Sequence, residues 1–243
     1  MKEGDRMSIF ITGDTHGEYD GFLNHLYQHM ITKDDIVIVC GDFGFVWDSP
    51  YHRYFLAKLV AEPFTITFAD GNHEDFDLLH TYPVVEWNGG KAHKIADNIY
   101  HLMRGQHFVI EGSSFFIMGG AYSIDKAMRI EGKSWWKQEL PNNEEYKIAE
   151  RTLESCGYTT DYIITHTIPQ SAIRELGFTP DIHDAELTGY FDYLYEKMTF
   201  KKWFSGHFHI NRIIRGNLQL LYDDVVVLSG NHKECDTRII NNI

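Results

Sequence analysis

Short islands of Asp, Asn, His and Gly punctuate this chain, and most of them follow directly on a run of β-branched or aromatic residues. In chain order the islands are GDTHG at 13–17, GDFG at 41–44, GNHE at 71–74, a lone His166, and GHFH at 206–209. The first three are spaced by about 30 residues each, the length of one strand–helix–strand unit. Right-handed crossovers would place three parallel strand ends side by side, with an island at each carboxyl end. This spacing predicts a β-α-β-α-β arrangement for the first third of the chain.

The residues between the islands have the periodicity that this arrangement needs. Strands are expected at 8–12, 36–40 and 64–68, and helices at 19–30 and 51–61. The segment 36–40 is apolar throughout, which is typical of a strand covered on both faces.

The pattern changes after residue 95, where short strands follow one another closely. Those at 99–102, 107–110 and 114–118 are joined by glycine-containing turns, which predicts an antiparallel meander. The remaining elements that we expect are helices at 142–155 and 185–198 and strands at 162–165, 202–205, 210–215, 218–222 and 225–228. A turn at Gly216-Asn217 should join two of these strands as a hairpin.

No linker, internal repeat or low-complexity segment divides the chain. We therefore expect a single domain over residues 7–243, preceded by a disordered lead-in at residues 1–6. The fold class that these elements predict is α/β, as a four-layer α/β/β/α sandwich of two mixed sheets flanked by helices. A hydrophobic fraction of 43%, with 14% aromatic residues, is ample for the buried core of such a sandwich.

Composition excludes several classes of protein. The chain has no run of about 18 apolar residues and no apolar stretch near its start, so neither a membrane span nor a signal peptide is expected. Three scattered cysteines without CxxC spacing fit a reducing compartment, and we expect a cytoplasmic protein. A net charge of −13 argues against a broad basic surface for duplex nucleic acid or anionic lipid. It does not argue against a substrate that carries phosphate.

The side chains in the islands suit metal ions. Carboxylate, imidazole and amide groups are ligands for divalent ions such as Mn, Fe or Zn. Two such ions about 3.5–4 Å apart need a bridging group, for which a carboxylate is the usual choice. Asp42 is the central aspartate of the ordered set, while the pairs Asp14/His16 and His207/His209 each share an i, i+2 spacing that lets both side chains face one site.

This ordered set resembles the calcineurin-like metallophosphoesterase superfamily, and the resemblance extends over residues 13–209. It implies a centre of two divalent ions. The ligands of the first ion would be Asp14, His16, Asp42 and His209. Those of the second would be Asp42, Asn72, His166 and His207. A hydroxide that bridges the ions would attack phosphorus, and His73 would lie beside the leaving oxygen as general acid or electrostatic stabiliser.

One departure from the superfamily matters. Its phosphoprotein phosphatases extend the second island to GDxxDRG, whereas this chain reads GDFGFV at 41–46. The aspartate that orients the catalytic histidine and the substrate-binding arginine are therefore both missing. Asp48 is the nearest candidate for orienting His73. The missing arginine weakens an assignment as a serine/threonine protein phosphatase.

Some residues have a plainer interpretation. A single histidine after an apolar strand, such as His166, is more often structural than ligating, and only its place in the ordered set favours a ligand. A second GNH triplet at 230–232 comes after the last island, so we do not expect it to reach the site. The histidines outside the islands are expected to be surface or hydrogen-bonded structural residues.

The segment 119–136 is rich in polar and aromatic side chains and could overhang the metals. Lys126 or Arg129 could grip a phosphate, and Tyr122 or Trp135 could stack on a base. The alternative is a hydrophobic plug that closes one end of the sandwich, and the sequence does not separate the two.

The function that this resemblance implies is metal-dependent hydrolysis of phosphate esters, by a phosphatase or a phosphodiesterase. Two divalent ions are expected as cofactors, with Mn preferred and Fe or Zn also suitable. Candidate substrates are a small phosphorylated metabolite, a nucleotide or a phosphopeptide. The rival from another class is a metal-passive interaction scaffold on the same fold.

Overall fold

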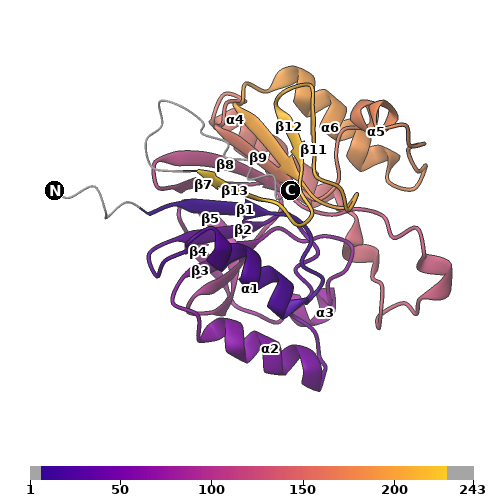
Figure 1. The fold of residues 1–243 in the computed structure, drawn as a ribbon. Helices are drawn as coiled ribbons and strands as arrows, with labels where there is room; N and C mark the ends of the chain where they lie inside the picture. Colours follow the sequence, from indigo (N-terminus) through magenta and orange to yellow (C-terminus); the bar gives the residue numbers. More distant parts are fainter. Residues whose placement is uncertain (1–6, 229–243) are drawn as a thin grey trace.

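The structure is a computed structural model that describes residues 7–228, and its α/β architecture follows the predicted class (Figure 1). The lead-in expected at residues 1–6 and the second GNH triplet at 230–232 lie outside the described residues. No helix within residues 7–228 has the length and apolar character needed to cross a membrane.

The first sheet is built around the three parallel strands that the island spacing predicts. Its strands, in spatial order, are β13 (Val225–Leu228), β1 (Ile9–Thr12), β2 (Ile36–Val39), β3 (Thr65–Phe68), β6 (Ile99–Leu102), β5 (Gly90–Ala96) and β4 (Val84–Trp87). The crossovers between β1, β2 and β3 are α1 (Tyr19–Gln28) and α2 (Pro50–Val60). Thr12 pairs with Val39, and Val39 pairs with Phe68, so the three strands end level with one another. The islands that follow them leave the sheet at the same edge.

The second sheet supplies two further islands. Its strands, in spatial order, are β11 (Arg212–Ile214), β12 (Leu218–Leu220), β10 (Lys202–Ser205), β9 (Tyr162–Thr165), β8 (Ser113–Met118) and β7 (Gln106–Ile110). β8, β9 and β10 run parallel to one another. β9 ends directly before His166 and β10 ends directly before Gly206, so these two islands leave the second sheet at the same edge. The hairpin predicted at Gly216-Asn217 is confirmed, since β11 and β12 pair antiparallel.

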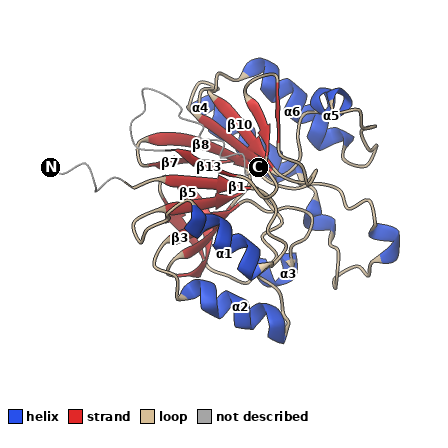
Figure 2. Cartoon of the chain, in the orientation of Figure 1, coloured by secondary structure: helices blue, strands red, loops and turns tan. Residues whose placement is uncertain are grey.

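Helices cover the outer face of each sheet, which gives the predicted α/β/β/α order of layers (Figure 2). Beyond the two crossovers, the α-helices are α3 (Phe76–Leu79), α4 (Asn143–Ser155), α5 (Gln170–Glu175) and α6 (Ala185–Lys197). Two short 3₁₀ helices lie at Lys126–Met128 and Lys137–Glu139.

The alternation of side chains along the strands builds these layers. On β1, Phe10 packs in a cluster with Phe22 of α1, whereas Ile11 packs between the sheets with Ile117 and Ile164 of the second sheet. A third apolar cluster fills the space between the second sheet and its helices α4, α5 and α6. Because successive side chains on a strand point to opposite faces, each sheet contributes to two of these clusters.

The antiparallel meander predicted for residues 99–118 is partly wrong. β6 pairs with β3 as a parallel strand of the first sheet, whereas β7 and β8 pair antiparallel in the second. Short apolar strands in both sheets have the same two-residue periodicity, so the pattern cannot indicate where the chain changes sheets.

The hairpin between β4 and β5 was not predicted. Its turn residues Asn88 and Gly89 have φ angles of 46° and 90°, as the tight turns of two-residue hairpins require. The dipeptide Asn-Gly was the available signal in the sequence. The short helices α3 and α5 also escaped prediction, because four to six residues give little helical periodicity.

Arg104 holds the segment where the chain passes from the first sheet to the second. Its side chain is buried and donates from Nε to Asp70 Oδ2 at 2.8 Å, and from Nη2 to the same carboxylate and to the Gln138 carbonyl oxygen. His101 Nε2 lies 3.1 Å from the other oxygen of Asp70. Burial alone would raise the pKa of Asp70, but Arg104 and His101 hold it well below its ordinary value. Asp70 directly precedes Gly71, so this pair fixes where the third island begins.

The buried pair predicts a large loss of stability when one partner is removed. Arg104→Met should lower the free energy of unfolding by about 3–5 kcal/mol, because the Asp70 carboxylate would stay buried without its cation. The matched control is Arg151→Met at an exposed position of α4, which should change that free energy by less than about 0.5 kcal/mol. Urea unfolding followed by circular dichroism measures both variants. Equal losses in the two would contradict this role for Arg104.

Candidate metal centre

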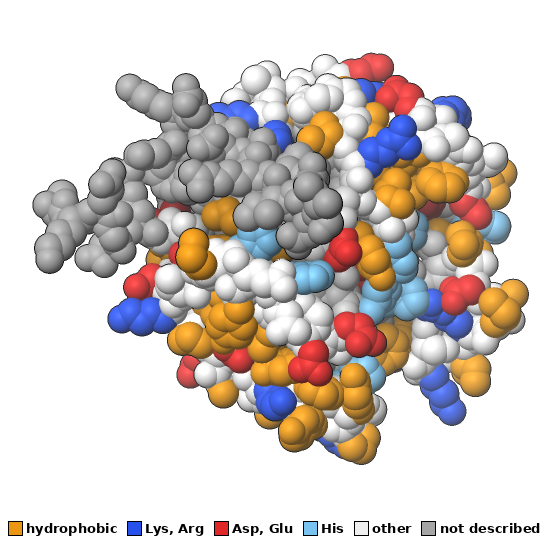
Figure 3. Space-filling model, in the orientation of Figure 1, with side chains coloured by type: hydrophobic (Ala, Val, Ile, Leu, Met, Phe, Trp, Pro, Cys, Tyr) orange, Lys and Arg blue, Asp and Glu red, His pale blue; other side chains and the backbone are white. Residues whose placement is uncertain are grey.

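The loops that follow β1, β2, β3, β9 and β10 bring the islands together where the two sheets meet. On the face shown in Figure 3, histidine side chains gather in a band beside acidic side chains. Two groups of potential metal donors lie where these loops meet, and they share one aspartate, Asp14.

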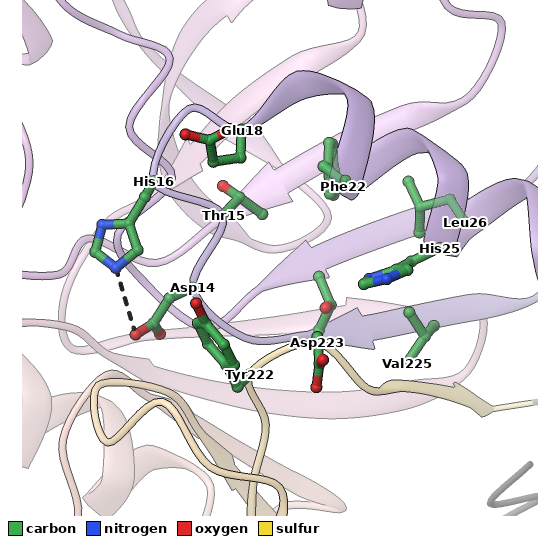
Figure 4. A pocket seen from close by; sticks show the side chains of 12 residues that line it. Asp14, Thr15, His16, Glu18, Phe22, His25, Leu26, Tyr222, Asp223 and Val225 are labelled. Carbon is green, nitrogen blue, oxygen red and sulfur yellow. Dashed lines mark ion pairs between the residues drawn. The ribbon is translucent and has the colours of Figure 1, made fainter. Parts of the chain in front are cut away.

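The first group consists of Asp14, His16 and His209, which offer one ligand atom each, all within 4.8 Å of one another. His16 Nε2 lies 2.9 Å from His209 Nε2, and the latter lies 3.1 Å from Asp14 Oδ2. His16 and Asp14 also lie at one end of a cavity beside α1 and Tyr222 (Figure 4). The volume of this cavity is about 430 Å³. Donors bound to one ion at about 2 Å lie about 3 Å apart, so these atoms have a spacing that suits a shared cation.

The second group consists of Asp14, Asp42 and His166, and all three side chains are buried. His166 Nε2 lies 3.4 Å from Asp42 Oδ1 and 3.1 Å from Asn72 Oδ1. The other ring nitrogen, Nδ1, donates to the Cys40 carbonyl oxygen at 2.9 Å. A histidine held in this way directs Nε2 towards the carboxylates, as metal-binding histidines direct it towards their ion.

Asp42 belongs to the second group and also faces the first. Its Oδ1 faces His166, while its Oδ2 lies 3.8 Å from His16 Nε2. One carboxylate oxygen is therefore directed towards each group, which is the arrangement that a bridging ligand needs.

His207 is placed differently from the other predicted ligands. Its backbone N–H donates to both carboxylate oxygens of Asp14, at 2.8 and 3.0 Å. Its ring lies 5.0 Å from the ring of His166, centroid to centroid. Within residues 7–228, its ring nitrogens do not belong to either three-donor group.

The buried carboxylates dominate the electrostatics of the centre. Burial alone would raise the pKa of Asp42, but His166, His73 and His16 hold it far below its ordinary value. Burial likewise opposes the charging of His166, yet Asp42 and Asp14 raise the pKa of His166 to about 10. The site therefore favours positive charge strongly, which is a property of a cation-binding centre.

The backbone of the islands is strained. The φ angles of His16, Asp42, His207 and His209 are 47°, 51°, 69° and 51°. Left-handed backbone is unfavourable for residues with a Cβ, and such residues cluster at functional sites where the surrounding structure enforces them. The strain turns the side chains out of the strand direction and towards one another.

Two glycines allow the carboxylates to approach the backbone closely. A Cβ on Gly71 would lie 2.0 Å from Asp42 Oδ1, and a Cβ on Gly206 would lie 2.0 Å from Asp14 Oδ1. Neither oxygen could keep its position beside a larger residue. These islands begin with glycine for a steric reason that the sequence alone does not reveal.

His73 contacts Arg129 and not Asp48. Its Nε2 and Nδ1 lie 2.8 and 3.1 Å from Arg129 Nη2, and its backbone N–H donates to Asp42 Oδ1 at 2.7 Å. Burial, together with Arg129, lowers the pKa of His73 although Asp42 opposes this. The hypothesis that Asp48 orients His73 is wrong, because Asp48 is exposed and pairs with Arg53 at 2.9 Å.

A cavity of about 550 Å³ opens beside the donor groups, and only some of the predicted substrate-binding residues line it. Tyr122 and Arg129 line this cavity. Lys126 and Trp135 are not among its lining residues; the Lys126 ammonium lies 3.8 Å from the ring centroid of Trp135. The alternative of a hydrophobic plug that closes one end of the sandwich fits Trp136, because this side chain is buried in the apolar cluster between the first sheet and its helices.

Sequence reasoning missed residues that support the centre. Glu74 is buried, and its Oε1 accepts a hydrogen bond from the Phe43 backbone N–H at 2.8 Å, which fixes the loop that carries Asp42. Ser123 Oγ accepts from Asn72 Nδ2 at 3.1 Å and so turns the Asn72 amide oxygen towards His166. Glu74 stood inside an island and was available as a signal, whereas nothing in the sequence marked Ser123.

Comparison with known proteins gives one family, and solved structures that resemble this chain include the two described below. The sequence model of the calcineurin-like phosphoesterase family matches residues 7–211. Phosphopantetheinyl hydrolase from Mycobacterium tuberculosis is 17% identical over 90% of this chain and 91% of its own, with a TM-score of 0.45. A serine/threonine phosphatase from Saccharomyces cerevisiae is 15% identical over 91% of this chain and 68% of its own, with a TM-score of 0.35. No curated protein shows significant similarity to the chain.

The close approach at Gly71 predicts that a single methyl group will disturb the centre. Gly71→Ala should bind Mn²⁺ at least about tenfold more weakly, because its Cβ would displace the Asp42 carboxylate. Gly21→Ala on α1 is the matched control, since a Cβ there meets no atom within 4 Å. It should leave metal affinity unchanged and stabilise the helix by about 0.5–1 kcal/mol. Titration with Mn²⁺ and elemental analysis measure both. Unchanged affinity in Gly71→Ala would show that Asp42 is not a ligand.

Proposed function

This chain belongs to the calcineurin-like phosphoesterase family, and we propose that it is a hydrolase of phosphate esters that depends on two divalent metal ions. The observation that carries this proposal is the convergence of the two donor groups on a shared buried aspartate, with Asp42 directed towards both. Imidazole, carboxylate and amide donors at this spacing fit divalent transition ions, with Mn preferred and Fe or Zn also suitable.

The ligand sets that we propose are those that the family implies, and the grouping of Asp14 with His16 and His209, and of Asp42 with His166, supports part of them. Those of the first ion are Asp14, His16, Asp42 and His209. Those of the second ion are Asp42, Asn72, His166 and His207. The neutral amide of Asn72 limits the negative charge of the second set. When bound, the ions supply the positive charge that ionises water near neutral pH and neutralises the phosphoryl oxygens during in-line displacement.

His73 and Arg129 are the residues that we propose to act on the substrate beside the metals. Both line the cavity, and Arg129 Nη2 lies within 3.1 Å of both ring nitrogens of His73. Arg129 would bind a non-bridging phosphate oxygen, because its guanidinium keeps its charge and presents several N–H donors. His73 would lie at the leaving oxygen and donate a proton to it, or stabilise its charge.

The substrate class, the cellular compartment and the domain bounds are predictions that the structure does not test. Small phosphorylated metabolites, nucleotides and phosphopeptides are all compatible with the centre, and a monoester or a diester could be cleaved. That the protein is cytoplasmic, and that residues 7–243 form a single domain, are likewise predictions from the sequence alone. The rival interpretation is a metal-passive scaffold, but a scaffold has no physical reason to keep the full donor set on strained backbone together with His73.

The first test is turnover by purified protein with Mn²⁺ of nitrophenyl phosphate and bis(nitrophenyl) phosphate. EDTA should abolish turnover, and the ratio of the two rates assigns the ester class. Asp42→Asn should lower kcat/KM by at least about 10²-fold, because the residue that faces both donor groups loses its charge. Asp48→Asn, an exposed aspartate outside the centre, is the matched control and should keep full activity. Full activity of Asp42→Asn in metal-replete buffer would exclude the proposal.

The role of His73 predicts a dependence on the leaving group. His73→Ala should keep both metals by elemental analysis and lose about 10²–10⁴-fold in kcat with phenyl phosphate, whose leaving group needs a proton. The loss with nitrophenyl phosphate should be smaller, because nitrophenolate leaves unprotonated. A rate with phenyl phosphate equal to that of the unaltered protein would remove His73 from the mechanism.

A further inference from the structure

The cavity beside the metal centre has a second wall that the metal mechanism does not use. On one side it is lined by His73, Arg129 and four of the proposed metal ligands, which are Asp42, Asn72, His207 and His209. The second wall is formed by Thr167 and by the residues between Ile173 and Asp184, which connect His166 of the centre to α6. This space adjoins the proposed ligands, so it can receive a group attached to a phosphate held at the metals.

Two buried polar atoms of this second wall have no hydrogen-bond partner among the described residues. They are Thr167 Oγ1 and Asp184 Oδ1. Thr167 is fully buried, and Asp184 is only 5% exposed. Buried polar groups in proteins are almost always satisfied, and an unpaired one is destabilising. Both residues line the same cavity, so a ligand in that cavity can supply the missing hydrogen-bond partners.

Asp184 occupies a position where its carboxylate would ordinarily be used. It is the N-cap residue of α6, and an aspartate there usually accepts hydrogen bonds from the first turn of the helix. Here the side chain makes no such bond; only the backbone carbonyl of Asp184 accepts from Thr188. A structural role as helix cap therefore does not account for this carboxylate.

Asp184 also differs from the other carboxylates of the two walls. Asp125 pairs with Arg129 at 2.9 Å, and Asp181 accepts from the His183 backbone at 2.8 Å and lies 2.7 Å from its ring. Burial, and then Asp181, raise the pKa of Asp184 to about 6, so at neutral pH it is mostly ionised. An ionised carboxylate only accepts hydrogen bonds, and it attracts a cation.

The rest of the wall is apolar. Phe178 is half exposed, and its ring lies 5.8 Å from that of Phe208 at an interplanar angle of 22°. Ile173 lines the same space. These side chains offer a surface for a carbon stem between the metals and the acceptor pair.

On the basis of the proposed hydrolase function, we propose that Asp184 and Thr167 form a subsite that binds a cationic amine on the leaving group of the substrate. The ammonium would donate to Asp184 Oδ1 and Thr167 Oγ1, and its carbon stem would lie against Phe178 and Phe208. The substrate class is a phosphate ester of an amino alcohol or of another alcohol that carries an amine.

The test compares two esters of equal size, 4-(2-aminoethyl)phenyl phosphate and 4-propylphenyl phosphate. The first ester carries an ammonium group where the second carries a methyl group. Both are used as monoesters or both as diesters, according to which nitrophenyl ester the protein cleaves faster. The unaltered protein should cleave the amine at least about tenfold faster in kcat/KM, since charge-assisted hydrogen bonds are strong. Asp184→Asn should reduce this preference to about twofold or less, and Thr167→Val should reduce it in part.

The matched control is Glu186→Gln, which removes the same charge from the first turn of α6 at an exposed position outside the cavity. It should keep the tenfold preference. A melting temperature of Asp184→Asn equal to or above that of the unaltered protein shows that the variant folds, as expected when a buried unpaired charge is neutralised.

The outcomes separate the subsite from the proposed function. Turnover of both esters at equal rates, or a preference that survives in Asp184→Asn, would overturn the subsite and leave the hydrolase standing. If Asp184→Asn does not fold, retention of the full preference by Thr167→Val would overturn the acceptor pair. Absence of metal-dependent turnover with any ester would instead reject the proposed function on which the subsite rests.

Discussion

The proximity of two buried carboxylates, Asp14 and Asp42, is the constraint on which the rest of this structure depends. Both offer a carboxylate oxygen within 4.8 Å of a His166 ring nitrogen, and both residues are buried. Like charges this close are unfavourable in a protein interior unless cations or protonated partners compensate them. The surrounding histidines provide part of that compensation, as the raised pKa of His166 indicates. The fold therefore places two buried carboxylates where they need positive charge beside them.

The fold meets this constraint through backbone geometry. Parallel strands in both sheets end where the islands begin, and left-handed residues then turn the side chains towards a common point. Glycines at 71 and 206 leave room for the carboxylate oxygens, and Glu74 and Ser123 hold the loops around them. Strain of this kind persists only where the surrounding packing enforces it. The two sheets and their three apolar clusters supply that packing.

In the proposed function, specificity depends on other parts of the chain. The metal-side lining of the large cavity comes mainly from the islands, whereas its second wall comes from the connection between β9 and α6. That connection lacks regular structure over much of its length and carries apolar, acidic and hydroxyl groups in no periodic order. Loops of this type can change without disturbing the core, because few of their backbone groups belong to a sheet. The proposed chemistry of the centre and the proposed choice of substrate would therefore be set by separate segments.

The sequence by itself determined the α/β class, the parallel strands β1 to β3, the hairpin of β11 and β12, and the family, because strand periodicity and island order are local properties of the chain. Tertiary structure decided the rest. It moved β6 into the first sheet, paired Asp48 with Arg53, and placed Arg129 against His73. It also left Thr167 and Asp184 buried without partners. Such contacts join residues far apart in the chain, and their distances follow from packing, which no local pattern of residue types records.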